Sequence, residues 1–166
     1  MLNHMNNVSL FKDVMGNYPT GVTVVTTVDE NGNPIGLTVN SFASVSLEPL
    51  LILWSIDKRV STYHSFINTD QFAVHVLSEN QGAICSLFAS KGIDRFKHCE
   101  WKFSNNRLPI IFGASGVLHC KTFKTIEAGD HTILIGEVFE IENENIEPLL
   151  YHRRNFGKIP ETFYTE

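Results

Sequence analysis

The spacing of apolar and polar residues along the chain predicts many short strands. Residues 22–28 (VTVVTTV) are nearly all β-branched, a composition typical of a strand. The Asn-Gly pair in the following segment, 29–34, favours a hairpin turn. We expect the next strands at residues 35–45, 50–56, 71–77, 109–111, 116–123, 131–142 and 149–151.

Helical patterns are few and short. Apolar residues recur at helical spacing between residues 83 and 88, and Ser78 followed by Gln81 fits a capping box that opens a helix ending near Ser90. Residues 10–15 and 61–68 predict two more short helices or turns. Many strands with so few helices predict a mainly β protein, a closed or nearly closed antiparallel barrel. No GxGxxG or P-loop motif is present in the sequence.

Composition narrows the possible partners. A length of 166 residues favours one domain, 1–166, and a net charge of -5 without a dense basic run argues against nucleic acid or an anionic membrane as partner. The three cysteines show neither CxxC pairing nor metal-ligand spacing, so we expect reduced thiols and no metal site. No signal-like segment or membrane-length apolar run is seen, which predicts a cytoplasmic protein.

One predicted strand is unusually polar. Residues 36–46 (GLTVNSFASVS) place hydroxyls and an amide among small and β-branched residues. Inside a protein, each such group needs a hydrogen-bond partner, and leaving one unsatisfied costs about 1–3 kcal/mol. A strand that lines a flat, polar ligand would use these groups, whereas the alternative is a strand whose polar face meets water.

Several segments together resemble the flavin reductase-like, FMN-binding split-barrel family. They are residues 19–27 (PTGVTVVTT), 36–46, 50–56 (LLILWSI), 88–89 (FA), 95–96 (RF), 129–131 (GDH), 135–138 (IGEV) and 148–151 (PLLY). Their order and spacing are similar to those of the reductase components of two-component flavin-dependent monooxygenases, over a core of about residues 11–158.

The resemblance implies an antiparallel Greek-key split barrel that forms a homodimer, with flavin bound near the subunit interface. It also implies NAD(P)H-dependent reduction of FMN or FAD, with the reduced flavin supplied to a monooxygenase partner. Two alternatives stay open: a flavoprotein oxidoreductase with tightly bound FMN that acts on another acceptor, and a non-catalytic flavin-binding protein. FMN or FAD, and NADH or NADPH, are equally compatible with the sequence.

Candidate flavin contacts follow from the chemistry of the flavin. Its pyrimidine edge presents donors and acceptors, which suit Thr38, Asn40 and Ser41, with backbone contacts and apolar cover from Val39 and Phe42. Ser55 ends the next strand. Ser61 and Thr62 follow it at a predicted helix start, where they would hold a flavin phosphate; the alternative is a simple helix cap.

Most of the remaining candidates come from the resemblance. Phe88, Lys91 and Phe96 would close over the flavin and supply a phosphate partner, although Phe88 also fits a core position and Lys91 a surface one. His131 of the Gly-Asp-His triplet would position the nicotinamide, the alternative being a turn histidine bonded to Asp130. Tyr151 and Arg153 are candidates by their position near the C-terminus and not by the resemblance: they would approach the same opening, where Arg153 would meet a cofactor phosphate.

Overall fold

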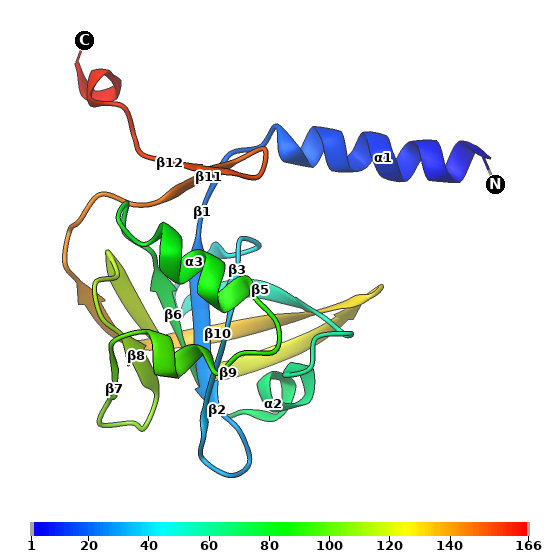
Figure 1. The fold of residues 1–166 in the computed structure, drawn as a ribbon. Coiled ribbons are helices and arrows are strands. Elements are labelled where there is room, and N and C mark those ends of the chain that lie inside the picture. The colour runs from blue at the N-terminus through cyan, green and yellow to red at the C-terminus, as the bar shows by residue number, and fades with distance from the viewer. Residues whose placement is uncertain (1, 166) are drawn as a thin grey trace.

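The computed structural model describes residues 2–165. Its helices are α1 (Leu2–Gly16), α2 (Tyr63–Asn68) and α3 (Gly82–Ala89), with 3-10 turns η1 (Arg95–His98) and η2 (Glu161–Tyr164). Its strands are β1 (Thr20–Gly21), β2 (Thr23–Val28), β3 (Pro34–Val39), β4 (Ala43–Leu47), β5 (Leu50–Asp57), β6 (Gln71–Val76), β7 (Trp101–Phe103), β8 (Pro109–Ile111), β9 (Gly116–Ala128), β10 (His131–Asn143), β11 (Leu150–His152) and β12 (Asn155–Gly157). Figure 1 shows α1 and the C-terminal segment standing away from the strands.

Seven strands form one antiparallel sheet in the order β3-β2-β6-β9-β10-β5-β4. Its two edge strands, β3 and β4, are joined by residues 40–42 alone. Four Cα steps of 3.8 Å span at most roughly 15 Å, so the two edges must approach each other and the sheet must curl. The predicted, nearly closed antiparallel barrel is therefore confirmed.

The prediction of one continuous strand over residues 35–45 was wrong. The strand breaks at residues 40–42, where the Ser41 hydroxyl accepts a hydrogen bond from the Ser55 N–H (2.9 Å) and donates one to the Ser55 carbonyl (3.3 Å). This contact holds residues 40–42 against β5, where the chain passes from the β3 edge of the sheet to the β4 edge.

The barrel interior is aromatic. Trp54 packs edge-to-face on Phe66 and Phe72, with ring centroids 5.3 and 5.8 Å away, and all three rings are fully buried. Along β5, Ile52, Trp54 and Ile56 are buried and point inward, because successive strand residues alternate between faces. Leu51, Leu53 and Ser55 therefore lie on the outer face.

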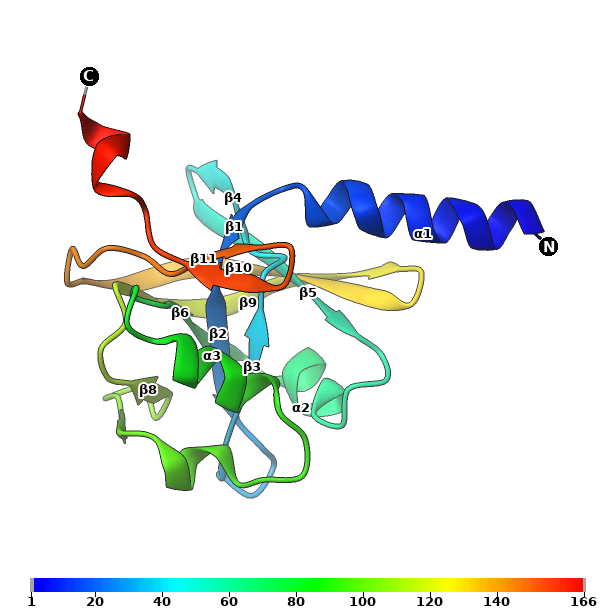
Figure 2. The same ribbon diagram turned by 45° about the horizontal axis from the view of Figure 1, so that its top comes forward.

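A second layer covers only part of that outer face. The α3 helix, η1 and the β7–β8 hairpin pack on β2, β3 and β6, and Figure 2 shows α3 in front of these strands. Phe88 and Phe96 are buried in this layer. Among the described residues, no helix or hairpin packs comparably on the outer face of β10, β5 and β4. The apolar residues of that part of the sheet remain partly exposed.

The helices differ most from the sequence predictions. The predicted helix at 10–15 extends over Leu2–Gly16, and the capping box is only half formed: the Gln81 side chain accepts from the Ser78 N–H (3.0 Å), but α3 begins at Gly82 with Gln81 as its N-cap. Ser78 instead bridges to Pro148, which keeps it outside the helix. The short strands β7 and β12 were not predicted. None of the helices in the described part of the chain has the length and apolar character to cross a membrane.

Candidate functional site

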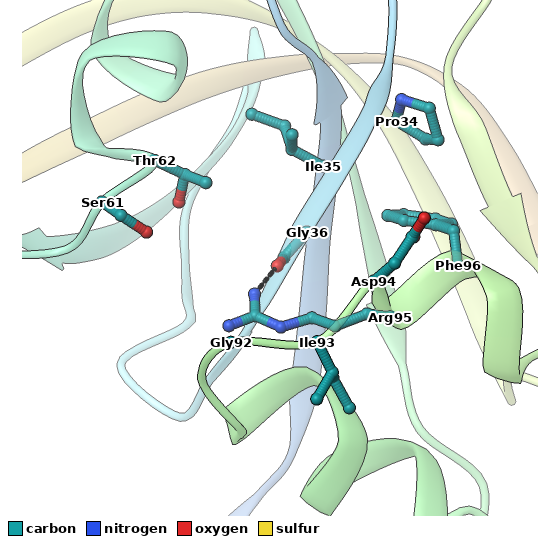
Figure 3. A pocket seen from close by; sticks show the side chains of 10 residues that line it. All are labelled: Pro34, Ile35, Gly36, Ser61, Thr62, Gly92, Ile93, Asp94, Arg95 and Phe96. Atoms are coloured by element: carbon teal, nitrogen blue, oxygen red, sulfur yellow. Dashed lines mark hydrogen bonds between the residues drawn. The ribbon is translucent and has the colours of Figure 1, made fainter.

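A hollow of about 220 Å³ opens beside the first half of β3, and we call it the Arg95 hollow. Three segments far apart in the sequence form its walls: the start of β3, the residues before α2, and the loop from α3 into η1 (Figure 3). Its lining residues are Pro34, Ile35, Gly36, Ser61, Thr62, Gly92, Ile93, Asp94, Arg95 and Phe96.

One hydroxyl in the Arg95 hollow lacks a partner from the described protein. The Thr62 hydroxyl is buried and has no hydrogen-bond partner within the described structure. Buried hydroxyls are normally paired, so the Thr62 oxygen stands out among the polar groups of this hollow. Ser61 lies beside it and is exposed.

Arg95 spans the same hollow. Its guanidinium donates to the Ser90 carbonyl through Nε (3.2 Å) and Nη2, and to the Gly36 carbonyl through Nη1. Figure 3 shows the guanidinium directed toward the side of the hollow where Ser61 and Thr62 lie. Burial lowers the pKa of Arg95, but a guanidinium stays protonated at any physiological pH.

A second hollow, about 240 Å³, lies past the other end of β3, and we call it the Thr20 hollow. Its walls are Thr20, Gly21, Val22, Thr23, Asn40, Phe42 and Val76. The Thr20 hydroxyl is also buried without a partner in the described structure, and Tyr151 pairs with Thr20 across the β1–β11 ladder. Four steps along the chain separate Gly36 of the first hollow from Asn40 of the second, so these lining residues lie roughly 13 Å apart along the direction of β3.

His131 lies on the outer face of the sheet, outside both hollows. Thr132 and Leu134 point inward, so His131 and Ile133 point outward, where Ile133 pairs with Ser55 across the ladder. The His131 Nδ1 atom is 2.7 Å from the Asp130 carboxylate, and this hydrogen bond lowers the pKa of Asp130. The His131 side chain is 41% exposed, and its hydrogen bond to Asp130 uses Nδ1 and not Nε2.

Several predicted residues have structural partners instead of lining a hollow. The Thr38 hydroxyl donates to the Cys85 carbonyl (2.7 Å) and so fastens β3 to α3, while Val39 is 6% exposed in the barrel core. Phe88 is buried edge-to-face against Phe96, at 5.2 Å between centroids. Their assignment as flavin contacts stays a prediction.

The predicted basic residues lie elsewhere. Lys91 is exposed and does not line the Arg95 hollow, and Arg153 bonds to the Asn17 side chain near the base of α1. The sequence analysis missed Arg95 and Thr20 as candidates. Both lie inside the quoted segments 95–96 and 19–27, but nothing local in the sequence shows that Arg95, and not Lys91, lines a hollow.

Comparison with known proteins gives a family match over most of the chain. Residues 15–160 match the family model described as "Flavin reductase like domain". The chain belongs to the flavin reductase-like family. This confirms the resemblance found in the sequence.

Named relatives of the flavin reductase-like family are similar over most of this chain. The "FMN reductase (NADH) SmoA" of Agrobacterium fabrum is 40% identical over 149 residues, which cover 90% of this chain and 84% of the relative. The reductase component of the flavin-dependent trigonelline monooxygenase of Acinetobacter baylyi is 42% identical over 90% of this chain. This chain spans only 48% of that relative's length.

Solved structures of flavin reductases share the fold. The NADH:FAD oxidoreductase SgcE6 of Streptomyces globisporus, in complex with NAD and FAD fragments, superposes with a TM-score of 0.88 at 34% identity, covering 94% of each chain. A homologue of nitrilotriacetate monooxygenase component B from Mycobacterium thermoresistibile has a TM-score of 0.91 at 31% identity, covering 98% of this chain and 92% of the other. The predicted split-barrel fold is thereby confirmed.

Proposed function

We propose that this chain is an NAD(P)H-dependent flavin reductase that uses FMN or FAD. The observation that carries the proposal is the 40% identity to an FMN reductase (NADH) over 90% of this chain and 84% of the relative. A flavin needs a polar edge contact, apolar cover and a phosphate site, and the two hollows beside β3 offer groups of each kind.

The orphan hydroxyls support this fit. Thr62 would donate to a phosphate oxygen in the Arg95 hollow, while Asn40 and Phe42 would meet the ring system in the Thr20 hollow. When bound, the flavin accepts a hydride from the nicotinamide, so the protein needs to supply orientation more than proton chemistry. Ser41 and Ser55 would line the path between that hollow and the outer face of the sheet.

His131 would hold the nicotinamide. It lies two residues along β10 from Ile133, the partner of Ser55, a separation of roughly 7 Å. Because Asp130 engages Nδ1, the free Nε2 would meet the carboxamide of the nicotinamide and orient the ring.

A homodimer would cover the apolar outer face of the sheet. The outer face of β4, β5 and β10 carries Leu51, Leu53, Ile133 and Ile135, which the described elements of this chain leave partly exposed. Ile126 of β9 pairs with Ile133 and adds to the same face at 38% exposed. A two-fold contact through this face would bury these residues and bring a second copy beside His131.

The reduced flavin would pass to a monooxygenase, as the name of the Acinetobacter relative suggests for that protein. We propose a cytoplasmic location for this chain and its monooxygenase partner. In the cytoplasm nicotinamide and flavin nucleotides occur together, and thiols such as Cys85 and Cys120 stay reduced. NADH is the favoured donor, because it is the donor named for the Agrobacterium relative.

The test is NADH and NADPH consumption by the purified chain with FMN, FAD and riboflavin in turn. We expect oxidation that saturates with added flavin and is negligible without it. Activity that is independent of added flavin, in a protein that is yellow as purified, would favour a fixed FMN group acting on another acceptor. Flavin binding without any NAD(P)H oxidation would refute the reductase and leave a binding protein.

A further inference from the structure

We propose that Tyr63 is a positioning residue for the nicotinamide reaction: through Thr132 and Glu127, its hydroxyl holds the β9–β10 turn that presents His131. This inference rests on the proposed reductase function and deepens it by naming the group that fixes His131 in place. Tyr63 is 8% exposed and belongs to the barrel core, so it acts on His131 only through other side chains.

The turn that carries His131 buries little of its own surface. Every residue from Phe123 to Asp130 is exposed, and Figure 1 shows this end of the β9–β10 hairpin projecting from the body of the sheet. Strand ends with few buried contacts open readily. A fixed position for His131 therefore depends on bonds from the turn to neighbouring elements.

A hydrogen-bond network that we call the Tyr63 network supplies such bonds. Thr132, next to His131, is the first buried side chain of β10 at 2% exposed. Its hydroxyl lies 2.7 Å from the Tyr63 hydroxyl on α2 and donates to the Glu127 carboxylate at 3.2 Å. A carboxylate only accepts and a hydroxyl has one proton, so the Tyr63 O–H donates to Thr132.

Lys58 completes the Tyr63 network on the other side of the turn. Its ammonium pairs with the second Glu127 oxygen, and its N–H donates to the Asp130 carbonyl (3.0 Å). The hydrogen bond from Lys58 is the main cause of the lowered pKa of Glu127, so this carboxylate is ionised at neutral pH. Because the ion pair is largely exposed, it contributes little alone, and the buried Tyr63–Thr132 link is the anchor.

Both neighbours of His131 are thus held. Asp130 is held through its carbonyl and Thr132 through its hydroxyl, while the Asp130 carboxylate bonds the His131 ring. Successive strand residues point to opposite faces, so the depth of Thr132 in the barrel sets how far the His131 ring stands above the outer face. Small displacements of an orienting group are costly to a reaction that depends on the alignment of two rings.

The experiment compares Tyr63→Phe, which keeps the buried ring and removes the hydroxyl, with Thr132→Val and Thr132→Ser. KM and kcat for NADH, flavin dissociation constants and melting temperatures are measured for each variant, alone and combined with His131→Ala. The matched control is Tyr164→Phe, which loses a tyrosine hydroxyl bonded to the Glu147 carboxylate far from the turn.

Tyr63→Phe and Thr132→Val should each raise the KM for NADH about 3- to 30-fold, with flavin dissociation constants within about 2-fold of the wild type. Thr132→Ser should keep the KM near that of the wild type, because serine retains the hydroxyl. With His131→Ala present, neither change should raise the KM further, since the Tyr63 network then has no imidazole to position. Tyr164→Phe should match the wild type.

An unchanged KM in Tyr63→Phe would overturn the positioning role. So would effects of the same size with and without His131, a Thr132→Ser variant as impaired as Thr132→Val, or equal weakening of flavin binding, all of which indicate a general loss of structure. These outcomes in a chain that oxidises NADH would leave the reductase proposal standing. A wild type that binds flavin without oxidising NAD(P)H would refute both proposals together.

Discussion

Acidification should destabilise this protein through one buried histidine. His75 of β6 is fully buried, its Nδ1 lies 3.0 Å from the Val24 carbonyl, and its Nε2 lies 3.1 Å from the Ile111 N–H. A carbonyl only accepts and an N–H only donates, so Nδ1 carries the proton and Nε2 must keep its lone pair. The neutral ring therefore links β2 of the barrel to β8 of the second layer.

Protonation of His75 would break the bond from Ile111 and bury a charge. Burial lowers the pKa of His75 from 6.5 to about 4, mainly by desolvation. The Val24 carbonyl and Glu142 oppose this shift in pKa, and the neighbouring His119 adds to it. The unfolded chain thus takes up this proton below about pH 6.5, whereas the folded chain resists until about pH 4.

The sign and size follow from linkage. Between these two pKa values the unfolded state binds more protons, so the free energy of unfolding falls as pH falls, by up to about 1.4 kcal/mol per pH unit. A difference of 2.5 units gives a total loss of about 3 kcal/mol by pH 4. Above pH 6.5 this contribution is fully present.

Urea unfolding followed by Trp fluorescence at pH 7, 6, 5 and 4.5 would measure the free energy of unfolding of the wild type and of His75→Gln. The stability advantage of the wild type should shrink steadily below pH 6.5, because only the wild type carries the buried imidazole. His98→Gln, at an exposed position, should track the wild type at every pH. A wild-type advantage that is constant with pH would refute the reasoning.

Three further outcomes follow from the site and the core. His131→Ala should raise the KM for NAD(P)H more than that for flavin in steady-state assays. Gly136→Ala should destabilise by about 1–3 kcal/mol in urea melts, because the added methyl would lie 2.5 Å from the buried Phe72 ring. Leu53→Glu should shift the particle from dimer to monomer mass in light scattering, since it puts a charge on the partly exposed apolar face.

Two of these variants have a matched control. Gly82→Ala meets nothing within 4 Å and should change stability by less than about 0.5 kcal/mol. Phe163→Glu, at a position 72% exposed on η2, should leave the mass unchanged. Unaltered KM and kcat in His131→Ala would remove its nicotinamide role, and a Gly136→Ala protein as stable as Gly82→Ala would contradict the packing described here.

Features governed by neighbouring residues could be predicted from the sequence. The turn after β2 is one: the Asp29 carboxylate accepts from the N–H groups of Asn31 (2.9 Å) and Asn33 (2.8 Å), and Gly32 takes a positive φ of 80°. Both are local preferences of Asp and Gly. The strands on either side followed from composition in the same way.

Features governed by distant contacts could not. The break at residues 40–42 depends on Ser55, 14 positions from Ser41, and a polar run alone predicts a continuing strand. The placement of the Arg95 side chain depends on the Gly36 carbonyl, 59 positions away. The role of Thr38 also depends on a residue far away in the sequence, because its hydroxyl donates to the Cys85 carbonyl of α3.

The walls of the Arg95 hollow come from segments near residues 35, 62 and 95. An anion seated there would act as a removable cross-link among three distant parts of the chain, in addition to the bond that already joins Arg95 to the Gly36 carbonyl. Since the unfolded chain offers no such convergence, occupancy would raise the melting temperature in proportion to the logarithm of ligand excess over Kd. Cellular flavin supply would then govern how long the protein survives as well as how fast it turns over.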